Sequence, residues 1–346
     1  MSSAHPIASG IDPVWRRYRD NFPRHVLGVT RYLESGVMEQ LAGVHGFGNL
    51  RLYYEPYITL AADEGIRLTE LAETLNISRQ AANQAANQIE AAGYLLRVPD
   101  PQDGRAKRII LTKNGRKLRA RGLQVAAKLQ RECGQIVGQE ALRQIVTTLA
   151  ELCAATGTSA ARISGPAMDE APLIALLPRL ANFISLRLMA SNIRRGHDGL
   201  KMSYGQVLTL IGPEGGRILR IAALQDVSKQ AVSAMVSELE QLGYIYRDRD
   251  PEDARQVLLR FTGLGRKLIE DSVEGMDELE MELGTIVGQA PLEQLRSSIE
   301  NLYRALQPDE AVFTDAGLNV KQLARELRGK LSPEARLHLA NLLLEQ

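Results

Sequence analysis

The fold is decided by the stretch from Thr69 to Leu118, which reads TELAETLNISRQAANQAANQIEAAGYLLRVPDPQDGRAKRIILTKNGRKL. Its apolar spacing predicts a short helix, a turn and a second, polar helix, followed by a hairpin of two short strands. The same pattern returns from Leu219 to Leu268 as LRIAALQDVSKQAVSAMVSELEQLGYIYRDRDPEDARQVLLRFTGLGRKL. The chain therefore carries one structural unit twice.

The two copies align over a long segment without a gap. Between Arg67–Leu118 and Arg217–Leu268, 18 of 52 aligned positions are identical, whereas chance gives about three at roughly 6 % identity per position. We therefore predict a duplication. Its parts are a first domain at residues 1–156, a linker at 157–172, a second domain at 173–308 and a C-terminal helical extension at 309–346.

Capping residues and apolar spacing define the two helices of the first copy. Thr69 and Ser78 are predicted N-caps, and Gly93 is predicted to end the second helix in a left-handed conformation. The predicted buried faces are Leu71, Ala72 and Leu75 on the first helix, and Ala81, Ala85, Ile89 and Ala92 on the second. Long amphipathic helices are expected after each hairpin, interrupted near Gly138 and Gly288.

The outward face of the second helix is rich in amides and carries one guanidinium. Arg can match the edge of guanine in a DNA major groove, and Asn or Gln can match adenine. The predicted DNA-binding residues of this helix are Ser78, Arg79, Gln80, Asn83, Gln84 and Asn87. An ordinary solvated helix face is the alternative interpretation of the same pattern.

The hairpin that follows has the features of a DNA-binding wing. Tyr94–Val98 and Lys107–Thr112 are the expected strands, and Arg105 at the tip is placed to enter a minor groove. Lys107 and Arg108 are expected to contact phosphates. We predict that Asp100 and Asp103 structure the turn, with Asp103 pairing with Arg105 or capping the turn.

These features together resemble the MarR family of winged helix-turn-helix transcription regulators. The resemblance rests on Leu71-Ala72, Ser78, Ile89-Glu90, Gly93-Tyr94, Asp100-Pro101, Asp103, Arg105, Leu111-Thr112 and Gly115. Members are normally homodimers of subunits about one copy long, joined by long terminal helices. The resemblance implies a mainly α fold with small β-wings. Its tandem winged helix-turn-helix domains would form an intramolecular pseudo-dimer through those helices.

The second copy departs from the first at several of these positions. Gln225 replaces the expected buried Leu75, and Val257 and Leu258 replace the basic pair of the first wing. Its predicted DNA-binding residues are Ser228, Lys229, Gln230, Ser233, Ser237 and Arg255, with Asp250 and Asp253 structuring the wing. We therefore expect unequal half-sites and a non-palindromic or degenerate operator.

The resemblance also implies a small aromatic or phenolic effector, bound between the interface helices and the winged helix. Candidate ligand-binding residues in the corresponding stretches are His45, Tyr54, Tyr57, His197 and Tyr204. Core aromatics with a chance histidine are the alternative. Cys133 and Cys153 lie in later helices, away from the position at which some relatives sense oxidants.

Composition and motifs exclude several other classes. The chain has a net charge of +1, yet residues 1–165 hold 21 Lys and Arg against 15 Asp and Glu, so a polyanion is expected to favour this half. No signal peptide and no run of eighteen apolar residues is visible, which predicts a cytoplasmic protein without a membrane segment. No phosphate loop, metal-spaced His/Cys set or nucleophile elbow occurs, so neither cofactor, metal nor enzymatic activity is expected.

The predicted function is a sequence-specific regulator of transcription, a repressor, that binds double-stranded DNA and is released by the effector. The alternative is a degenerate winged-helix module for protein interaction or ligand binding, without sequence-specific DNA binding. The expected assembly is a monomeric pseudo-dimer, or a higher oligomer formed through the extension at residues 309–346.

Overall fold

A computed structural model describes residues 13–61, 65–75, 77–103, 106–158, 170–213, 215–218, 221, 229–249 and 257–306. The chain divides into two compact units, and each is discontinuous in sequence. The first-module unit comprises Phe22–Ile184 and Glu280–Leu306. The second-module unit comprises Met1–Asn21, Ser185–Leu279 and Gln307–Gln346. The linear domain boundaries given above remain a prediction.

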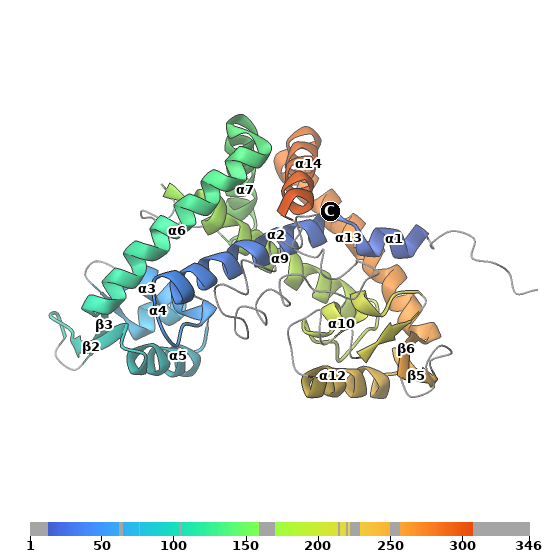
Figure 1. The fold of residues 1–346 in the computed structure, drawn as a ribbon, viewed down its shortest axis with the longest axis horizontal. Helices are drawn as coiled ribbons and strands as arrows, with labels where there is room; N and C mark the ends of the chain where they lie inside the picture. The colour runs from blue at the N-terminus through green and yellow to red at the C-terminus, as the bar shows by residue number, and fades with distance from the viewer. Residues whose placement is uncertain are drawn as a thin grey trace, which may run out of the picture. The chain divides into compact units, whose positions relative to one another are not determined.

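The first-module unit contains the first winged helix (Figure 1). Its α-helices are α3 (Glu55–Leu60), α4 (Leu68–Thr74) and α5 (Arg79–Ala91), preceded by the π-helix η1 (Gln40–Val44) and the 3-10 helix η2 (Leu52–Tyr54). Its antiparallel sheet has the order β1-β3-β2, formed by Ile66–Arg67, Lys107–Leu111 and Leu95–Pro99. The two wing strands were predicted to within a residue, and the short third strand β1 was not.

Local signals define the ends of α5 as predicted. The Ser78 side chain accepts a hydrogen bond from the backbone N–H of Ala81 at 3.1 Å. At the other end Gly93 has φ +82°, and the N–H of Tyr94 donates to the Ile89 carbonyl at 3.1 Å. This is the glycine-terminated helix end in which the orphan carbonyls of the last turn find partners.

Two local predictions were wrong. Thr69 does not cap α4, because the helix begins at Leu68 with Arg67 at the N-cap. On α5 the buried residues are Ala82, Ala86 and Ile89, while Ala81 is exposed. Ile89 was predicted correctly, and Ala85 and Ala92 are half-buried against the core. Alanines occupy two adjacent rows of this helix, so the sequence pattern alone does not distinguish the row at Ala82 from the row at Ala81.

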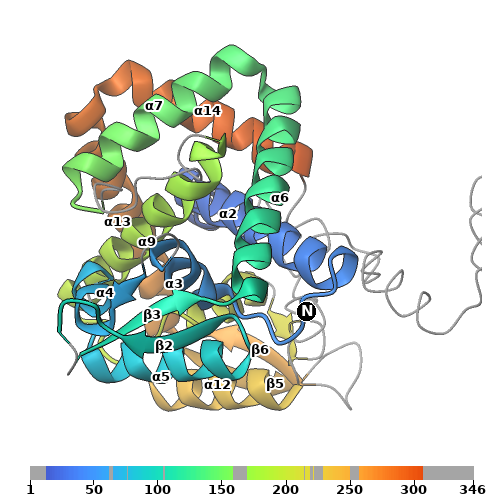
Figure 2. The ribbon, with the colours of Figure 1, turned by 90° about the vertical axis from the view of Figure 1, so that its left-hand side faces the viewer.

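Residues from all of these elements form the core of the first winged helix. Leu71, Ile89 and Leu95 are almost fully buried, together with Tyr54 and Tyr57. Leu75, expected to be buried, is half-buried at the edge of this core. The core sets α5 against the sheet, and Figure 2 shows the hairpin β2–β3 beside α5.

A close backbone approach joins the wing to the long helix α6 (Lys113–Val137). Thr112 caps α6 by accepting from the Gly115 N–H at 2.9 Å, and its hydroxyl donates to the Gly93 carbonyl at 2.7 Å. A Cβ on Gly115 would stand 2.1 Å from the Tyr94 carbonyl oxygen. In the second copy, a Cβ on Gly265 would stand 2.0 Å from the equivalent oxygen of Tyr244. Only glycine fits this position, which explains its identity in both copies.

The second-module unit repeats this fold. Its described elements are α10 (Tyr204–Ile211), β4 (Gly216–Arg217), α12 (Lys229–Gln241), β5 (Ile245–Arg249) and β6 (Val257–Phe261), with the sheet order β4-β6-β5. Gly243 ends α12 with φ +80° in the same manner as Gly93 ends α5. The described parts of both units are therefore mainly helical with small antiparallel wing sheets, as predicted.

The helices outside the winged helices do not pack in sequence order. In the first-module unit, α2 (Phe22–Glu39), α6 and α7 (Gln139–Ala155) pack with α14 (Gln289–Leu306), which follows the second winged helix in the chain. Leu295, Ile299 and Leu302 of α14 are almost fully buried. Figures 1 and 2 both show α7 and α14 side by side.

The second-module unit also contains a helix from the other sequence copy. Helix α1 (Pro13–Arg19), from the start of the chain, buries Trp15 and Tyr18 in a cluster with Ile269 and Val273 of α13 (Gly263–Val287). The rings of Trp15 and Phe261 lie 5.6 Å apart. Each unit is therefore completed by a helix from the other sequence copy. The predicted interruptions occur as well, since α6 ends before Gly138 and α13 before Gly288, both with positive φ.

Helix α9 (Pro172–Arg194) is the most apolar of the long helices. Among the described residues, it is the one helix whose length and mean hydropathy, 1.5, would permit it to cross a membrane. Core helices of globular proteins have the same property. Its N-terminal half buries Leu173, Leu177 and Leu180, and the Leu173 N–H donates to Gln130 on α6 at 2.9 Å.

Candidate nucleic-acid interface

The outward face of α5 is exposed as predicted. Arg79, Gln80, Asn83, Gln84 and Asn87 are all solvent-exposed. The backbone of α5 is held by its caps and by the buried residues Ala82, Ala86 and Ile89, and these side chains project from the opposite face. Ser78 stands apart from them, since its hydroxyl is engaged in capping.

An arginine on the wing strand β2 holds two of these amides. Nη2 of Arg97 donates to Oδ1 of Asn83 at 3.1 Å and to Oδ1 of Asn87 at 2.7 Å. The same guanidinium forms an ion pair with Glu90, whose other oxygen accepts from the Arg97 backbone N–H at 3.1 Å. Because each amide accepts through its oxygen, its Nδ2 group remains as the donor available to a ligand.

Sequence reasoning missed the roles of Arg97 and Glu90. Both residues are identical in the two copies, as Arg247 and Glu240, and this identity was the available signal. The second copy repeats the arrangement. Nη2 of Arg247 donates to the Ser237 hydroxyl at 3.0 Å, and its Nε lies 3.6 Å from Glu240.

A buried carboxylate organises the first wing. Asp100 is 3 % exposed and accepts from Arg67 through both oxygens, at 2.7 and 3.0 Å. It also accepts from the backbone N–H groups of Gln102 and Asp103. The bonds from Arg67, followed by those from the turn, hold the pKa of Asp100 far below its usual value.

The other predicted residues of the first wing differ in exposure and contacts. Asp103 is exposed, and its carbonyl accepts from the Ala106 N–H at 2.8 Å. Its predicted pairing with Arg105 stays a prediction. Lys107 is exposed, while Arg108 is half-buried with Nε 3.4 Å from Asp100. Arg105, the predicted wing tip, lies outside the described residues.

The second module is described less completely. Gln230 is exposed, and Ser233 and Ser237 are half-buried. The side chain of Lys229 and the whole of Ser228, Asp250, Asp253 and Arg255 lie outside the described residues. On α12 Glu238 accepts from Lys201 at 2.7 Å and is also bonded by the Tyr204 hydroxyl, at the position that Gln88 holds in the first copy. The face of α12 is therefore more acidic than that of α5.

The predicted ligand-binding residues do not form one cluster within either unit. Tyr54 and Tyr57 belong to the core of the first winged helix, whereas His45 is exposed. Tyr204 is buried in the second core. His197 is buried between the Tyr244 hydroxyl at 3.2 Å and Asp271 at 2.8 Å.

Burial raises the pKa of Asp271, but hydrogen bonds from Lys267 and His197 lower it by more, so the net shift is downward. The carboxylate is therefore ionised and fully engaged inside the second module. Because both ring nitrogens of His197 are bonded within the module, the residue has a structural role there.

Both cysteines are buried thiols. Burial raises the pKa of Cys133 to about 11, and burial also raises the pKa of Cys153. The reactive form of cysteine is the thiolate, which such shifts suppress at neutral pH. No group of three or more His, Cys, Asp or Glu side chains with a metal-binding arrangement occurs in the described part of the chain.

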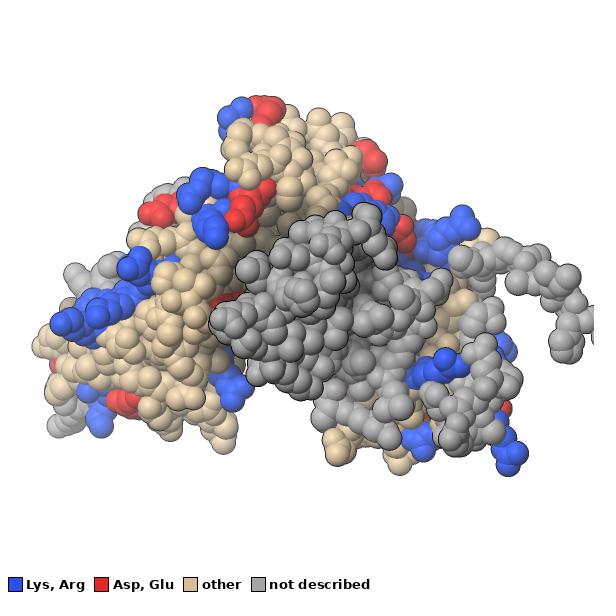
Figure 3. All heavy atoms as spheres, in the orientation of Figure 1, with Lys and Arg blue, Asp and Glu red and all other residues tan. Residues whose placement is uncertain are grey.

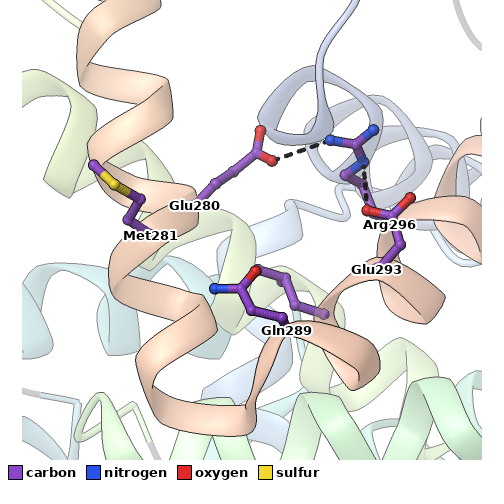
Figure 4. Close-up of a pocket in the computed structure, with 6 residues that line it drawn as sticks. Glu280, Met281, Gln289, Glu293 and Arg296 are labelled. Atoms are coloured by element: carbon purple, nitrogen blue, oxygen red, sulfur yellow. Dashed lines mark hydrogen bonds and ion pairs between the residues drawn. The ribbon is translucent and has the colours of Figure 1, made fainter.

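A polar pocket of about 330 Å³ lies where α13 meets α14 (Figure 4). Arg296 bridges Glu280 at 3.5 Å and Glu293 at 3.4 Å across it. Met281, Gln289 and Leu292 also line the pocket. None of the predicted ligand-binding residues lines this pocket.

Comparison with known families agrees with the geometry of the two modules. The model of the MarR family matches residues 58–106 and again residues 198–256. The chain carries two MarR-family winged-helix modules. Each match covers the helix-turn-helix and the start of the wing. No curated protein matches the chain.

Solved structures similar to this tandem MarR-family chain include three regulators. Tm0710 from Thermotoga maritima is 21 % identical, with a TM-score of 0.30, over 39 % of this chain and 96 % of its own. A MarR-family regulator from Rhodococcus sp. RHA1 is 23 % identical, with a TM-score of 0.30, over 37 % and 90 %. A mutant of S. aureus MepR, bound to an oligodeoxyribonucleotide, is 23 % identical, with a TM-score of 0.28, over 37 % and 96 %.

Proposed function

We propose that this tandem MarR-family chain is a transcription regulator that binds double-stranded DNA sequence-specifically. Helix α5 enters a major groove with Arg79, Gln80 and Gln84, while Asn83 and Asn87 offer Nδ2 donors to base edges. The observation that carries the proposal is the exposed amide face of α5, ordered by Arg97 from the wing strand. Side chains held in this way lose little rotamer freedom on binding, which favours recognition of base edges.

The wing supplies contacts to the DNA backbone beside that groove. Lys107 contacts phosphate, and Arg105 reaches the flanking minor groove. Arg108 shares its charge with Asp100 and contributes less. Phosphate contacts fix the position of the protein on the duplex, whereas the contacts of α5 distinguish sequences.

One chain then does the work of two subunits. The packing of α14 against α2 and α7 in one unit, and of α1 against α13 in the other, supports an intramolecular pseudo-dimer. The protein acts as a monomeric pseudo-dimer or associates further through the C-terminal extension. It has no enzymatic activity and works in the cytoplasm.

The regulatory role belongs to the same proposal. The protein is a repressor, and a small aromatic or phenolic effector releases it from DNA by shifting the population between two arrangements of the recognition helices. The candidate residues for binding the effector are three aromatic residues and two histidines: Tyr54, Tyr57, Tyr204, His45 and His197.

Selection of bound fragments from a random duplex pool, followed by sequencing, tests the proposal. We expect an enriched motif, and an affinity that falls steeply with salt because each phosphate contact releases counterions. Replacing Asn83 and Asn87 together by Ala abolishes the enrichment, whereas Gln144→Ala on α7 leaves it intact. If folded protein binds no duplex at low salt, the alternative of an interaction module takes its place.

A further inference from the structure

Helix α6 carries a row of exposed cations along one face. Lys113, Lys117, Arg121, Lys128 and Arg131 are all exposed. At 100° per residue their directions around the helix axis fall within about 80° of one another. Between Lys113 and Arg131 the helix contains no Asp or Glu. We call these five residues the α6 basic stripe.

The stripe is long and keeps its charge. Lys113 and Arg131 are separated by about 27 Å along the axis, at a rise of about 1.5 Å per residue. Among the residues that the structure describes, Lys128 is the one member that forms an ion pair, with Glu132 at 3.9 Å. In Figure 3 blue side chains gather along the arm that α6 forms in Figure 1.

The equivalent face of the second module is different. The positions that align with the stripe on α13 are Gly263, Lys267, Asp271, Glu278 and Met281. Asp271 is bonded to His197 and Lys267, and Glu278 accepts from Arg195 at 2.6 Å. The second copy thus uses this face for internal contacts. The fold does not require cations there, so the stripe calls for a separate explanation.

The stripe is continuous with the first wing. The wing strand β3 begins at Lys107 and is followed by Thr112, the N-cap of α6, and then by Lys113. In Figure 1 the helix rises from the wing, away from α5. A duplex held by α5 and the wing therefore leaves the protein beside the base of the stripe.

We infer that the α6 basic stripe binds the backbone of duplex DNA that flanks the first module's half-site. The inference rests on the proposed DNA-binding function. Charge complementarity and continuity with the wing favour this occupant, since DNA carries one phosphate per about 1.7 Å of axis. The stripe spans about eight base pairs at 3.4 Å per pair. Because α6 rises away from α5, the flank bends toward the helix as it follows the stripe.

Duplexes of three designs test this inference with the full chain. One carries only the selected operator, and the other two extend it by about fifteen base pairs on either side. Wild-type protein is expected to bind one extended duplex more tightly, with a steeper dependence of log affinity on log salt. The other extension adds nothing, because α13 offers no stripe. Energy transfer between dyes at the duplex ends reports a bend in the favoured extension alone.

A matched pair of variants tests whether the α6 basic stripe causes the tighter binding of the extended duplex. The stripe variant carries Arg121→Gln, Lys128→Gln and Arg131→Gln, which keep helix propensity. The control variant carries Arg143→Gln, Arg296→Gln and Arg304→Gln, three exposed arginines of α7 and α14. On the favoured duplex the stripe variant is expected to lose about 2 to 3 units of salt slope, at about 0.9 per phosphate. The control variant keeps the wild-type slope.

The outcomes separate this inference from the proposed function. If all three proteins bind the short operator equally and gain equally from the extension, the stripe does not bind flanking DNA and the inference is overturned. Stripe-dependent binding of single-stranded RNA, without stripe dependence on duplex, overturns it as well. If wild-type protein binds no duplex of any design, the proposed function itself has failed.

Discussion

At the scale of single residues, the interface depends on two side chains whose partners lie on other elements. Asp100 joins Arg67 to the wing turn, and Arg97 joins the wing strand to Asn83 and Asn87 on α5. Each buried or half-buried charge has several partners, so the wing and the recognition helix hold one another in place. Such charge-assisted bonds are stronger than neutral ones and fix geometry as well.

Arg97→Met keeps the carboxamides of Asn83 and Asn87 but removes the group that orients them. Methionine keeps much of the apolar stem but removes the guanidinium, so both carboxamides rotate freely. We expect roughly tenfold less discrimination between operator and mutated operator, within the 1–3 kcal/mol of a good base contact. Binding to unrelated duplex stays nearly constant. Competition binding measures the ratio.

Arg247→Met is the matched control in the second module. Besides the carboxylate of Glu240, Arg247 bonds one hydroxyl of α12, that of Ser237, so the loss of discrimination is expected to be smaller. Equal losses from the two variants would contradict the role assigned to the paired amides of α5.

At the scale of elements, the junction between wing and long helix leaves no room for a side chain at Gly115. Gly115 lies under the Tyr94 carbonyl, and Thr112 ties the two together. This junction couples the start of α6 to the end of α5 through Gly93 and Tyr94. The start of α6 and the end of the recognition helix therefore share one set of backbone contacts.

Gly115→Ala is expected to destabilise the protein by about 1–3 kcal/mol, the typical cost of overpacking. The added methyl would meet a backbone oxygen, which cannot move without shifting the wing. Gly122→Ala is the control in the same helix, because a Cβ there meets nothing within 4 Å. It is expected to stabilise by about 0.5–1 kcal/mol through helix propensity. Urea unfolding measures both, and equal changes would refute the steric argument.

At the scale of the whole molecule, the two modules are alike in fold and unlike in surface. The first presents amides on α5 and cations on α6, while the second has Glu238 on α12 and acidic residues on α13. Each unit includes one helix from the other sequence copy: α14 in the first-module unit and α1 in the second-module unit. The duplication has therefore diverged in the residues available to DNA, and has kept the core.

Unequal modules predict an unequal footprint. Hydroxyl-radical cleavage of operator DNA should show stronger and longer protection on the side of the first module. Replacing Asn83 and Asn87 by Ala is expected to weaken binding about tenfold more than replacing Ser233 and Ser237, since an amide pair makes stronger base contacts than hydroxyls. Mirror-symmetric protection of a palindromic site would contradict both expectations.

The sequence by itself determined the duplicated winged helix. The cap at Ser78, the glycine at Gly93, the wing strands and the exposed amides of α5 all follow from neighbours a few residues apart. The N-cap of α4 was placed two residues too late, and the buried alanines at the start of α5 were placed one residue too early.

Only the tertiary structure decided which distant residues meet. The packing of α14 on α2 and α7 and the cluster of α1 with α13 join positions far apart in the chain. The contacts of Arg97 and Asp100 join residues of different elements. Apolar periodicity shows that a helix face is buried, but any apolar face of suitable shape can cover it. The partner is chosen by packing across the whole unit, which no local pattern records.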